Sequence, residues 1–102
     1  MPVDDTLRAL AHPARRAMLA LAWDAERSSS ELAEAVALTR PAASQHLKVL
    51  RDAGLVHVRV DGNLRLYRVD ADRLAEVRRL LEEFWGDRLG RLAAGLAGEE
   101  ER

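Results

Sequence analysis

The sequence predicts a mainly α-helical fold with one β-hairpin, in the order helix, helix, helix, helix, strand, strand, helix. Three patterns predict this class. Apolar residues recur at helical spacing in the first half of the chain, alternate with polar residues from residue 56, and return to helical spacing after residue 70. Because no repeat or flexible linker divides the chain, we expect one domain over residues 1–98 and a frayed acidic tail over residues 99–102.

Composition excludes several classes of protein. The 102 residues suffice for a single core, and the absence of cysteine excludes disulfides, thiolate metal sites and cysteine nucleophiles. The longest apolar run, Ala17 to Trp23, has seven residues, which is too short to span a membrane. Since the chain starts with an acidic stretch unlike a secretory signal, we expect an unprocessed cytoplasmic protein with no membrane partner.

Spacing and proline indicate the first two helices. Apolar residues between Leu7 and Ala22 lie at helical intervals, and Pro13, after His12, suits the first position of a helix. We therefore expect a short helical turn followed by a helix over residues 13–24.

A brief turn joins the next two helices. Ser28 and Glu31 have the spacing of a capping box, which predicts a helix over residues 29–37. Thr39 is placed as the N-cap of a second helix over residues 40–53.

Gly54 is placed to end the helix over residues 40–53, and its buried stripe is predicted to be Ala43, Leu47 and Leu50.

A hairpin and a long helix complete the chain. Val56 to Val60 and Leu64 to Val69 are predicted strands around an Asp61-Gly62-Asn63 turn, whose loop of two or three residues leaves the register of Arg65 and Tyr67 open. Capped within residues 70–72, the last helix is expected to end near residues 95–98. Its apolar stripe is Leu74, Val77, Leu81, Phe84, Trp85, Leu89, Leu92 and Leu96.

This element order is that of a winged helix-turn-helix, whose second helix enters the major groove of DNA. Arginine and glutamine can each bind a base edge through two hydrogen bonds, and a lysine further along the helix suits phosphate. The predicted DNA-binding residues are Thr39, Arg40, Pro41, Ser44, Gln45, His46, Lys48, Arg59 and Arg65. The alternative is that these are ordinary polar residues on a solvated helix and hairpin, with His46 packed locally.

Charge alone does not decide between these interpretations. The chain has a net charge of −1, yet residues 40–68 hold six basic and two acidic residues, a local net of +4. Asp61 at the hairpin tip favours a shallow contact of Arg59 and Arg65 with DNA.

The apolar stripe of the last helix is longer than one small domain can cover, which favours a homodimer over a core or ligand pocket. The helix over residues 13–24 is the natural surface for it to meet, while Trp23 near the end of that helix is expected to pack internally. The predicted interface residues are Leu7, Leu10, Ala14, Met18, Leu81, Phe84, Trp85, Leu89 and Leu92.

Enzyme chemistry has little support. The histidines at 12, 46 and 57 lack metal-ligand spacing, and the chain contains neither a glycine-rich phosphate loop nor a paired carboxylate site. We expect no catalytic residues, no metal and no cofactor.

Three stretches resemble the arsenical-resistance-repressor (ArsR/SmtB) family: LRALAHPARR at residues 7–16, ELAE at 31–34 and RPAASQHLKVLRDAGLV at 40–56. The resemblance extends over residues 5–93. It implies a dimeric repressor that binds an imperfect palindrome in double-stranded DNA, with the first and last helices at the dimer interface and an inducer that releases DNA.

The resemblance also implies that this chain lacks the family's metal ligands. Ser28, Ser29 and Ser30 stand where metal-sensing members have Cys-Val-Cys, and residues 71–98 lack the histidine of a second family site. The stretch FWGDRL at residues 84–89 is similar to a branch without metal ligands, often encoded beside START-type lipid-binding proteins.

Two functions therefore follow from the sequence. The first is a sequence-specific homodimeric repressor that is not a cysteine-based metal sensor, with a small-molecule effector of unknown identity or none. The second is a winged-helix protein-interaction module with only non-specific DNA affinity.

Overall fold

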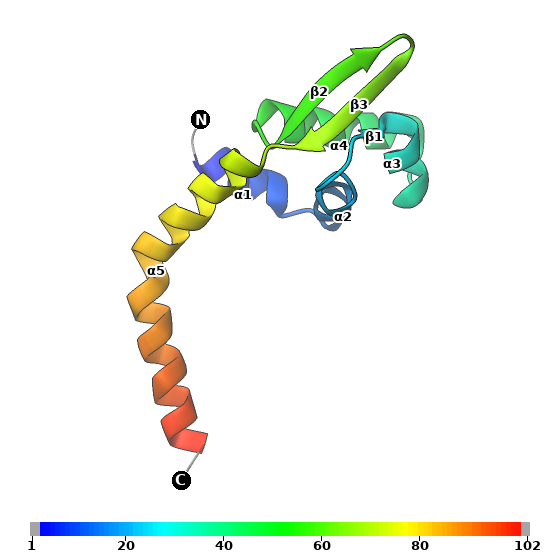
Figure 1. Cartoon of the computed structure of the whole chain (residues 1–102). Coiled ribbons are helices and arrows are strands. Elements are labelled where there is room, and N and C mark those ends of the chain that lie inside the picture. Colours follow the sequence, from blue (N-terminus) through cyan, green and yellow to red (C-terminus); the bar gives the residue numbers. More distant parts are fainter. Residues whose placement is uncertain (1–2, 101–102) are drawn as a thin grey trace.

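The computed structural model describes the backbone of residues 3–100 and the side chains of residues 4–88 and 90–95. Figure 1 shows a small body from which one long helix projects. The elements follow the order α1 (Val3–Leu10), α2 (Pro13–Leu21), β1 (Arg27–Ser28), α3 (Ser29–Ala35), α4 (Arg40–Asp52), β2 (Val56–Asp61), β3 (Leu64–Val69) and α5 (Ala71–Glu100). The predicted order is confirmed, with β1 as an additional strand.

Side-chain caps begin four of the helices, because the first amides of a helix have no partner within the helix itself. The Ser28 hydroxyl accepts a hydrogen bond from the Glu31 amide at 3.1 Å, and the Glu31 carboxylate accepts one from the Ser28 amide at 3.2 Å. The predicted capping box is therefore present. The Thr39 hydroxyl accepts from the Ala42 amide at 3.3 Å. The Nδ1 atom of His12 caps α2, a role that the sequence analysis did not foresee.

The turn between α3 and α4 depends on one residue in a left-handed conformation. Ala37 has a φ of 56°, and the Leu38 amide that follows it donates to the Ala33 carbonyl at 3.0 Å. This 6→1 hydrogen bond is typical of a Schellman helix ending. The backbone therefore turns sharply into α4 at a residue that lacks the conformational freedom of glycine.

The sheet has three antiparallel strands in the order β1-β3-β2. Asp61 pairs with Leu64, so the hairpin loop has two residues, of which Gly62 has a φ of 61°. The register opposes Val60 to Arg65 and Val58 to Tyr67, which settles the question that the sequence left open. We call the β2–β3 hairpin the wing.

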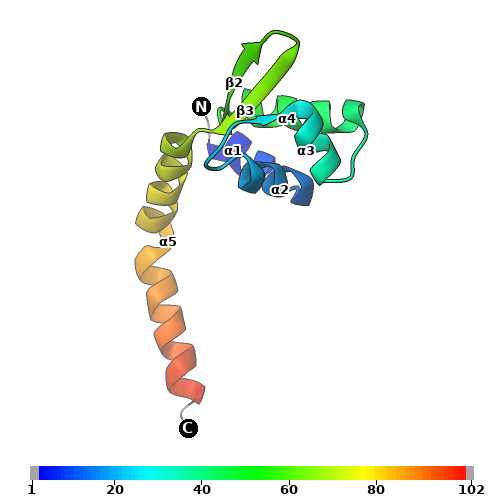
Figure 2. The same ribbon diagram turned by 45° about the vertical axis from the view of Figure 1, so that its right-hand side comes forward.

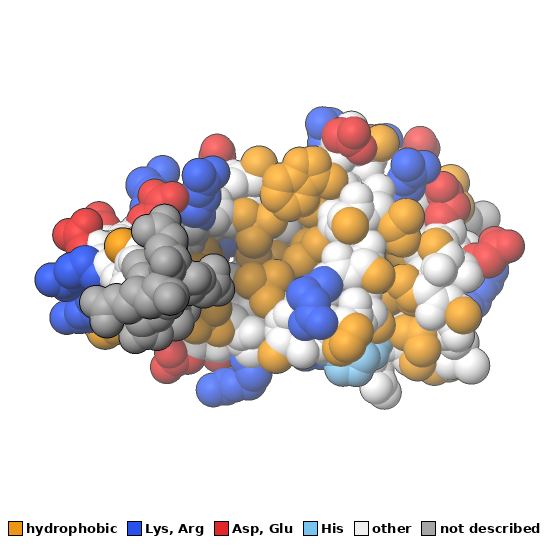
Figure 3. Space-filling model, turned by 90° about the horizontal axis from the view of Figure 1, so that it is seen from below, with side chains coloured by type: hydrophobic (Ala, Val, Ile, Leu, Met, Phe, Trp, Pro, Cys, Tyr) orange, Lys and Arg blue, Asp and Glu red, His pale blue; other side chains and the backbone are white. Residues whose placement is uncertain are grey.

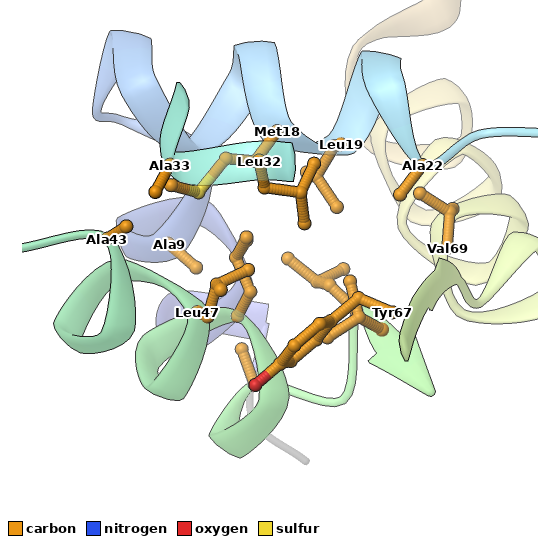
Figure 4. Close-up of a cluster of buried hydrophobic side chains, with 14 residues drawn as sticks. Ala9, Met18, Leu19, Ala22, Leu32, Ala33, Ala43, Leu47, Tyr67 and Val69 are labelled. Atoms are coloured by element: carbon orange, nitrogen blue, oxygen red, sulfur yellow. The ribbon is translucent and has the colours of Figure 1, made fainter. Parts of the chain in front are cut away.

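The core lies between α1 to α4 and one face of the sheet. In Figure 4, Tyr67 of the wing reaches toward Leu47 of α4, and Met18 and Leu32 close the core from the opposite side. Two backbone hydrogen bonds tie the end of the wing into this core. The Val69 amide donates to the Ala22 carbonyl at 3.0 Å, and the Asp70 amide donates to the Leu55 carbonyl at 2.8 Å.

Asp70 forms the joint between the wing and α5. Its carboxylate accepts from the Arg73 amide at 3.1 Å, so it caps α5. The other carboxylate oxygen lies 3.2 Å from Nε2 of His57 in β2. Backbone and side chain of one residue thus fix the direction in which α5 leaves the body.

Helix α5 leaves the body and is largely uncovered, as Figures 1 and 2 show from two directions. Val77 is buried and Leu74 packs against the core. Beyond them, Phe84 is 57 % exposed and Leu92 is 60 % exposed. Because the molecule measures 61 × 27 × 22 Å, one elongated helix dominates its shape.

Several predicted boundaries are wrong. Helix α5 continues to Glu100 instead of ending near residues 95–98, since glycine lowers helical stability without preventing a helix. Residues 99 and 100 are therefore helical, and the remainder of the predicted tail lies outside the described residues. Helix α2 ends at Leu21 rather than residue 24, and α1 is a helix of 8 residues rather than a single turn.

None of the helices in the described part of the chain combines the length and the apolar character needed to cross a membrane.

Candidate nucleic-acid interface

The turn between α3 and α4 directs one face of α4 away from the core. Ala43, Leu47 and Leu50 are buried, as predicted from their spacing. The outward side carries the predicted DNA-binding residues, and all of these except His46 are exposed. They are Thr39, Arg40, Pro41, Ser44, Gln45 and Lys48.

A polar groove separates α4 from β3. Its volume is about 220 Å³, and Lys48, Arg51 and Arg65 line it together with Ser44, Gln45, Leu47 and Tyr67. Arg65 reaches this groove because it lies on the same face of the wing as Val60 and Tyr67, the face that packs toward α4. The groove therefore brings three cations from two elements to one concave surface.

Lys48 is engaged within its own helix. Its Nζ atom lies 2.6 Å from Oδ2 of Asp52, one turn further along α4. The hydrogen bond from Lys48 lowers the pKa of Asp52. Both side chains are more than half exposed, so solvent screens the pair and an incoming phosphate can replace the carboxylate.

The structure separates the two predicted wing cations. Since neighbouring residues of a strand point to opposite faces, Arg59 lies on the face away from the groove. Its Nε and Nη2 atoms donate to the two carboxylate oxygens of Glu26, each at 3.0 Å. This hydrogen bond lowers the pKa of Glu26 and raises that of the Arg59 guanidinium. Arg59 and Arg65 thus have different surroundings.

His46 makes contacts within the chain. Its Nδ1 atom lies 3.3 Å from Nη1 of Arg15, and its ring centroid lies 4.3 Å from that of His12. Arg15 also donates to the Ala9 carbonyl at 2.7 Å, which links the end of α1 to the same cluster. Burial, followed by the charges of His12 and Arg15, lowers the pKa of His46. The structure shows these local contacts, and contact of His46 with DNA stays a prediction.

The predicted interface residues lie in three environments. Leu7, Phe84, Trp85 and Leu92 are exposed, and Leu10, Ala14 and Leu81 are half-buried. Met18 is 1 % exposed, so it belongs to the core and offers no surface to a partner. The side chain of Leu89 lies outside the described residues.

Trp23 is 55 % exposed, so the expectation that it packs internally is wrong. It borders a shallow apolar hollow of about 320 Å³ that Leu10, Leu19 and Leu74 also line. A second hollow, of about 330 Å³, follows α5 past Val77 and Leu81 and shares Leu74 with the first. Figure 3 shows apolar side chains gathered over this part of the body, beside α5.

Ser28, at the first of the three positions where the resemblance places metal ligands, caps α3 instead. Within the side chains that the structure describes, no three His, Cys, Asp or Glu residues gather as a metal site.

Sequence reasoning missed Glu26 and Tyr67 as neighbours of the interface residues. Glu26 lies 33 residues before Arg59, and only the pairing of β1 with β3 brings them together. The position of Tyr67 required the register, which the turn sequence alone did not fix.

The comparisons with known proteins agree with this geometry. A helix-turn-helix domain model matches residues 10–59. The transcriptional regulator Rv2034 of Mycobacterium tuberculosis is 42 % identical over 82 residues, which cover 80 % of this chain and 77 % of the relative.

Two solved structures extend the match to three dimensions. A possible transcriptional regulator for arsenical resistance is 44 % identical with a TM-score of 0.77, over 89 % of this chain and 95 % of that protein. Mb0332 of Mycobacterium bovis is described as a homodimeric winged helix-turn-helix DNA-binding domain and a possible ArsR-family regulator. It is 28 % identical with a TM-score of 0.67, over 87 % and 82 % of the two chains. The chain described here belongs to the ArsR/SmtB family of winged helix-turn-helix transcriptional regulators.

Proposed function

We propose that this protein is a sequence-specific repressor that binds an imperfect palindromic operator as a homodimer. The groove between α4 and β3, with Lys48, Arg51 and Arg65 around it, is the observation that carries the proposal. When a recognition helix enters the major groove and a wing approaches the adjacent minor groove, the DNA strand between the two grooves passes between helix and wing. A concave surface with three cations at that place suits its phosphates.

Base recognition is assigned to the N-terminal half of α4. Arg40, Ser44 and Gln45 are exposed there, and arginine and glutamine can bind guanine and adenine edges through paired hydrogen bonds. Thr39 and Pro41 stand at the helix N-terminus, where the positive end of the helix dipole favours a phosphate. His46 is assigned a supporting role, because its ring faces Arg15 and His12.

The homodimer is assigned to the uncovered apolar surface along α5 and the exposed part of α1. Phe84, Trp85 and Leu92 expose more apolar area than an isolated small protein favours. The two hollows that meet at Leu74 continue this surface onto the body. Repression follows if a dimer bound over two half-sites excludes RNA polymerase from a promoter.

A cysteine-based metal sensor is not part of this proposal, because the chain has no cysteine and Ser28 caps a helix. We expect zinc, cadmium and arsenite to leave the protein on its operator. Release of the operator by micromolar concentrations of any of the three would contradict this part of the proposal.

The decisive experiment is a gel-shift assay on an operator identified by a genome-wide binding map. The Arg40→Ala, Gln45→Ala double variant should fold and dimerise yet lose its preference for the operator over a scrambled duplex. Arg79→Ala, an exposed cation on α5, is the matched control and should keep that preference. Unchanged specificity of the double variant, or non-specific binding by the wild type, would overturn the proposal in favour of a protein-interaction module.

A further inference from the structure

The two faces of the wing carry different electrostatic surroundings. On the groove face, Arg65 has no ion pair or hydrogen bond with any residue that the structure describes. On the opposite face, Arg59 donates two hydrogen bonds to the carboxylate of Glu26, and its Nη1 atom lies 3.8 Å from Oδ2 of Asp61. One arginine is therefore available to an incoming anion, and the other already has two carboxylates beside it.

The sheet explains how Glu26 reaches Arg59. Strand β3 lies between β1 and β2, and Leu66 of β3 pairs with Ser28 on one side and with Arg59 on the other. Glu26 is two residues before Ser28, so it belongs to the same face as Leu66 and Arg59. The ion pair thus crosses β3 and joins the segment before β1 to the outer strand of the wing.

A phosphate that approached Arg59 would have to compete with Glu26 and Asp61 for its guanidinium. Bidentate pairing of an arginine with a carboxylate uses the same donors that would bind a phosphate. To reach DNA, Arg59 would have to break both hydrogen bonds and leave Glu26 without its partner.

We propose that Glu26 is a specificity-determining residue that withholds Arg59 from DNA and so limits the affinity of the wing for duplexes of any sequence. This inference rests on the DNA-binding function proposed above. Phosphate contacts carry no sequence information. If the wing makes fewer of them, base contacts by α4 contribute a larger share of the binding free energy, and the protein discriminates better between sequences. Glu26 acts through Arg59 and makes no contact with DNA itself.

The test compares two substitutions that remove one negative charge from the same segment. Glu26→Gln breaks the ion pair, whereas Asp24→Asn removes an exposed carboxylate for which the structure gives no ion pair or hydrogen bond in its described part. Affinity for a scrambled DNA duplex is measured between about 50 and about 200 mM KCl, where phosphate contacts dominate the salt dependence.

We expect Glu26→Gln to raise the affinity for the scrambled duplex about three- to tenfold at low salt and to steepen the salt slope by about 0.9, the value for one phosphate contact. Asp24→Asn should change neither quantity. The Glu26→Gln, Arg59→Ala double variant should return to the wild-type affinity, because the released cation is absent.

The single variant Arg59→Ala provides a second, independent test, because it can be interpreted even if the Glu26→Gln variant does not fold. It should leave affinity for the scrambled duplex unchanged, while Arg65→Ala should lower it. Equal behaviour of Glu26→Gln and Asp24→Asn, or equal losses in Arg59→Ala and Arg65→Ala, would overturn the inference. If the wild type bound no DNA, the proposed function itself would fail instead.

Discussion

The ammonium group of Lys48, which lines the groove between α4 and the wing, lies 2.6 Å from the carboxylate of Asp52 on the next turn of α4. The pair engages, within α4, the cation that we propose binds a DNA phosphate. Because both groups are exposed, this pair adds little to the free energy of unfolding and can reopen readily.

Lys48→Ala should therefore weaken DNA binding without changing sequence preference. Removal of one phosphate contact should reduce the salt slope by about 0.9 and lower affinity for operator and scrambled duplex alike. Binding isotherms for both duplexes at several salt concentrations measure this. Arg79→Ala serves as the control for lost charge, and a loss confined to the operator would mean that Lys48 reads bases.

Ala37→Gly should stabilise the protein. Ala37 has a φ of 56°, a conformation that costs an L-residue about 1 to 2 kcal/mol and glycine very little, so after the greater unfolded-state entropy of glycine we expect a gain of about 0.5 to 1 kcal/mol. Urea unfolding measures the difference. Ala35→Gly, at the exposed last residue of α3, is the matched control and should lower stability by up to about 1 kcal/mol. A loss of stability in both variants would contradict the assigned conformation.

The free energy of unfolding should fall in mild acid through His46. Its pKa is lowered in the folded protein, whereas in the unfolded chain it titrates near about 6.5. Above that pH the imidazole is neutral in both states and its contribution is complete. As the pH falls below it, the unfolded chain takes up the proton more readily, so stability is lost toward the folded pKa.

Urea unfolding at about pH 7.5 and about pH 5.5 brackets this transition. His46→Gln removes the titrating ring beside His12 and Arg15, so its stability should fall less between the two pH values than that of the wild type. An equal fall in both proteins would assign the pH dependence to other groups.

Phe84→Asp and Trp85→Asp should each weaken self-association. Exposed aromatic residues at the centre of an apolar surface are typical hot spots, and loss of one commonly costs about 2 kcal/mol, roughly a 30-fold rise in the dimer dissociation constant. Sedimentation equilibrium measures the dimer. Leu64→Asp is the matched control, because Leu64 is 50 % exposed at the wing tip and should leave the dimer intact. Wild-type dissociation constants for both α5 variants would place the interface elsewhere.

Features with a local cause could be predicted from the sequence. The Ser28–Glu31 capping box and the Thr39 cap depend on residues three apart, so their spacing alone predicts them. The buried stripe of α4 follows from helical periodicity in the same way. From the cap and the buried stripe, the sequence predicts which face of α4 points outward, and most of the candidate DNA-binding residues lie on that face.

Features with a long-range cause could not be predicted in this way. Strand β1 has two residues and no pattern of its own, yet its pairing with β3 brings Glu26 to Arg59. The cluster of His12, Arg15 and His46 likewise depends on the packing of α2 against α4. Met18 was expected at the dimer interface but lies in the core, and Trp23 was expected inside but is exposed. Helical periodicity identifies an apolar face without showing what covers it.

The joint at Asp70 has a consequence for the geometry of the operator. If Phe84 and Trp85 hold the dimer, they lie about 20 Å along α5 from that joint, at 1.5 Å per residue. A tilt of about 10° there would move each recognition helix by roughly 4 Å, a distance comparable to one base-pair step. In such a dimer, the contact between His57 and Asp70, together with the cap and the backbone hydrogen bond at Asp70, sets the angle of α5 and with it the spacing between the two recognition helices.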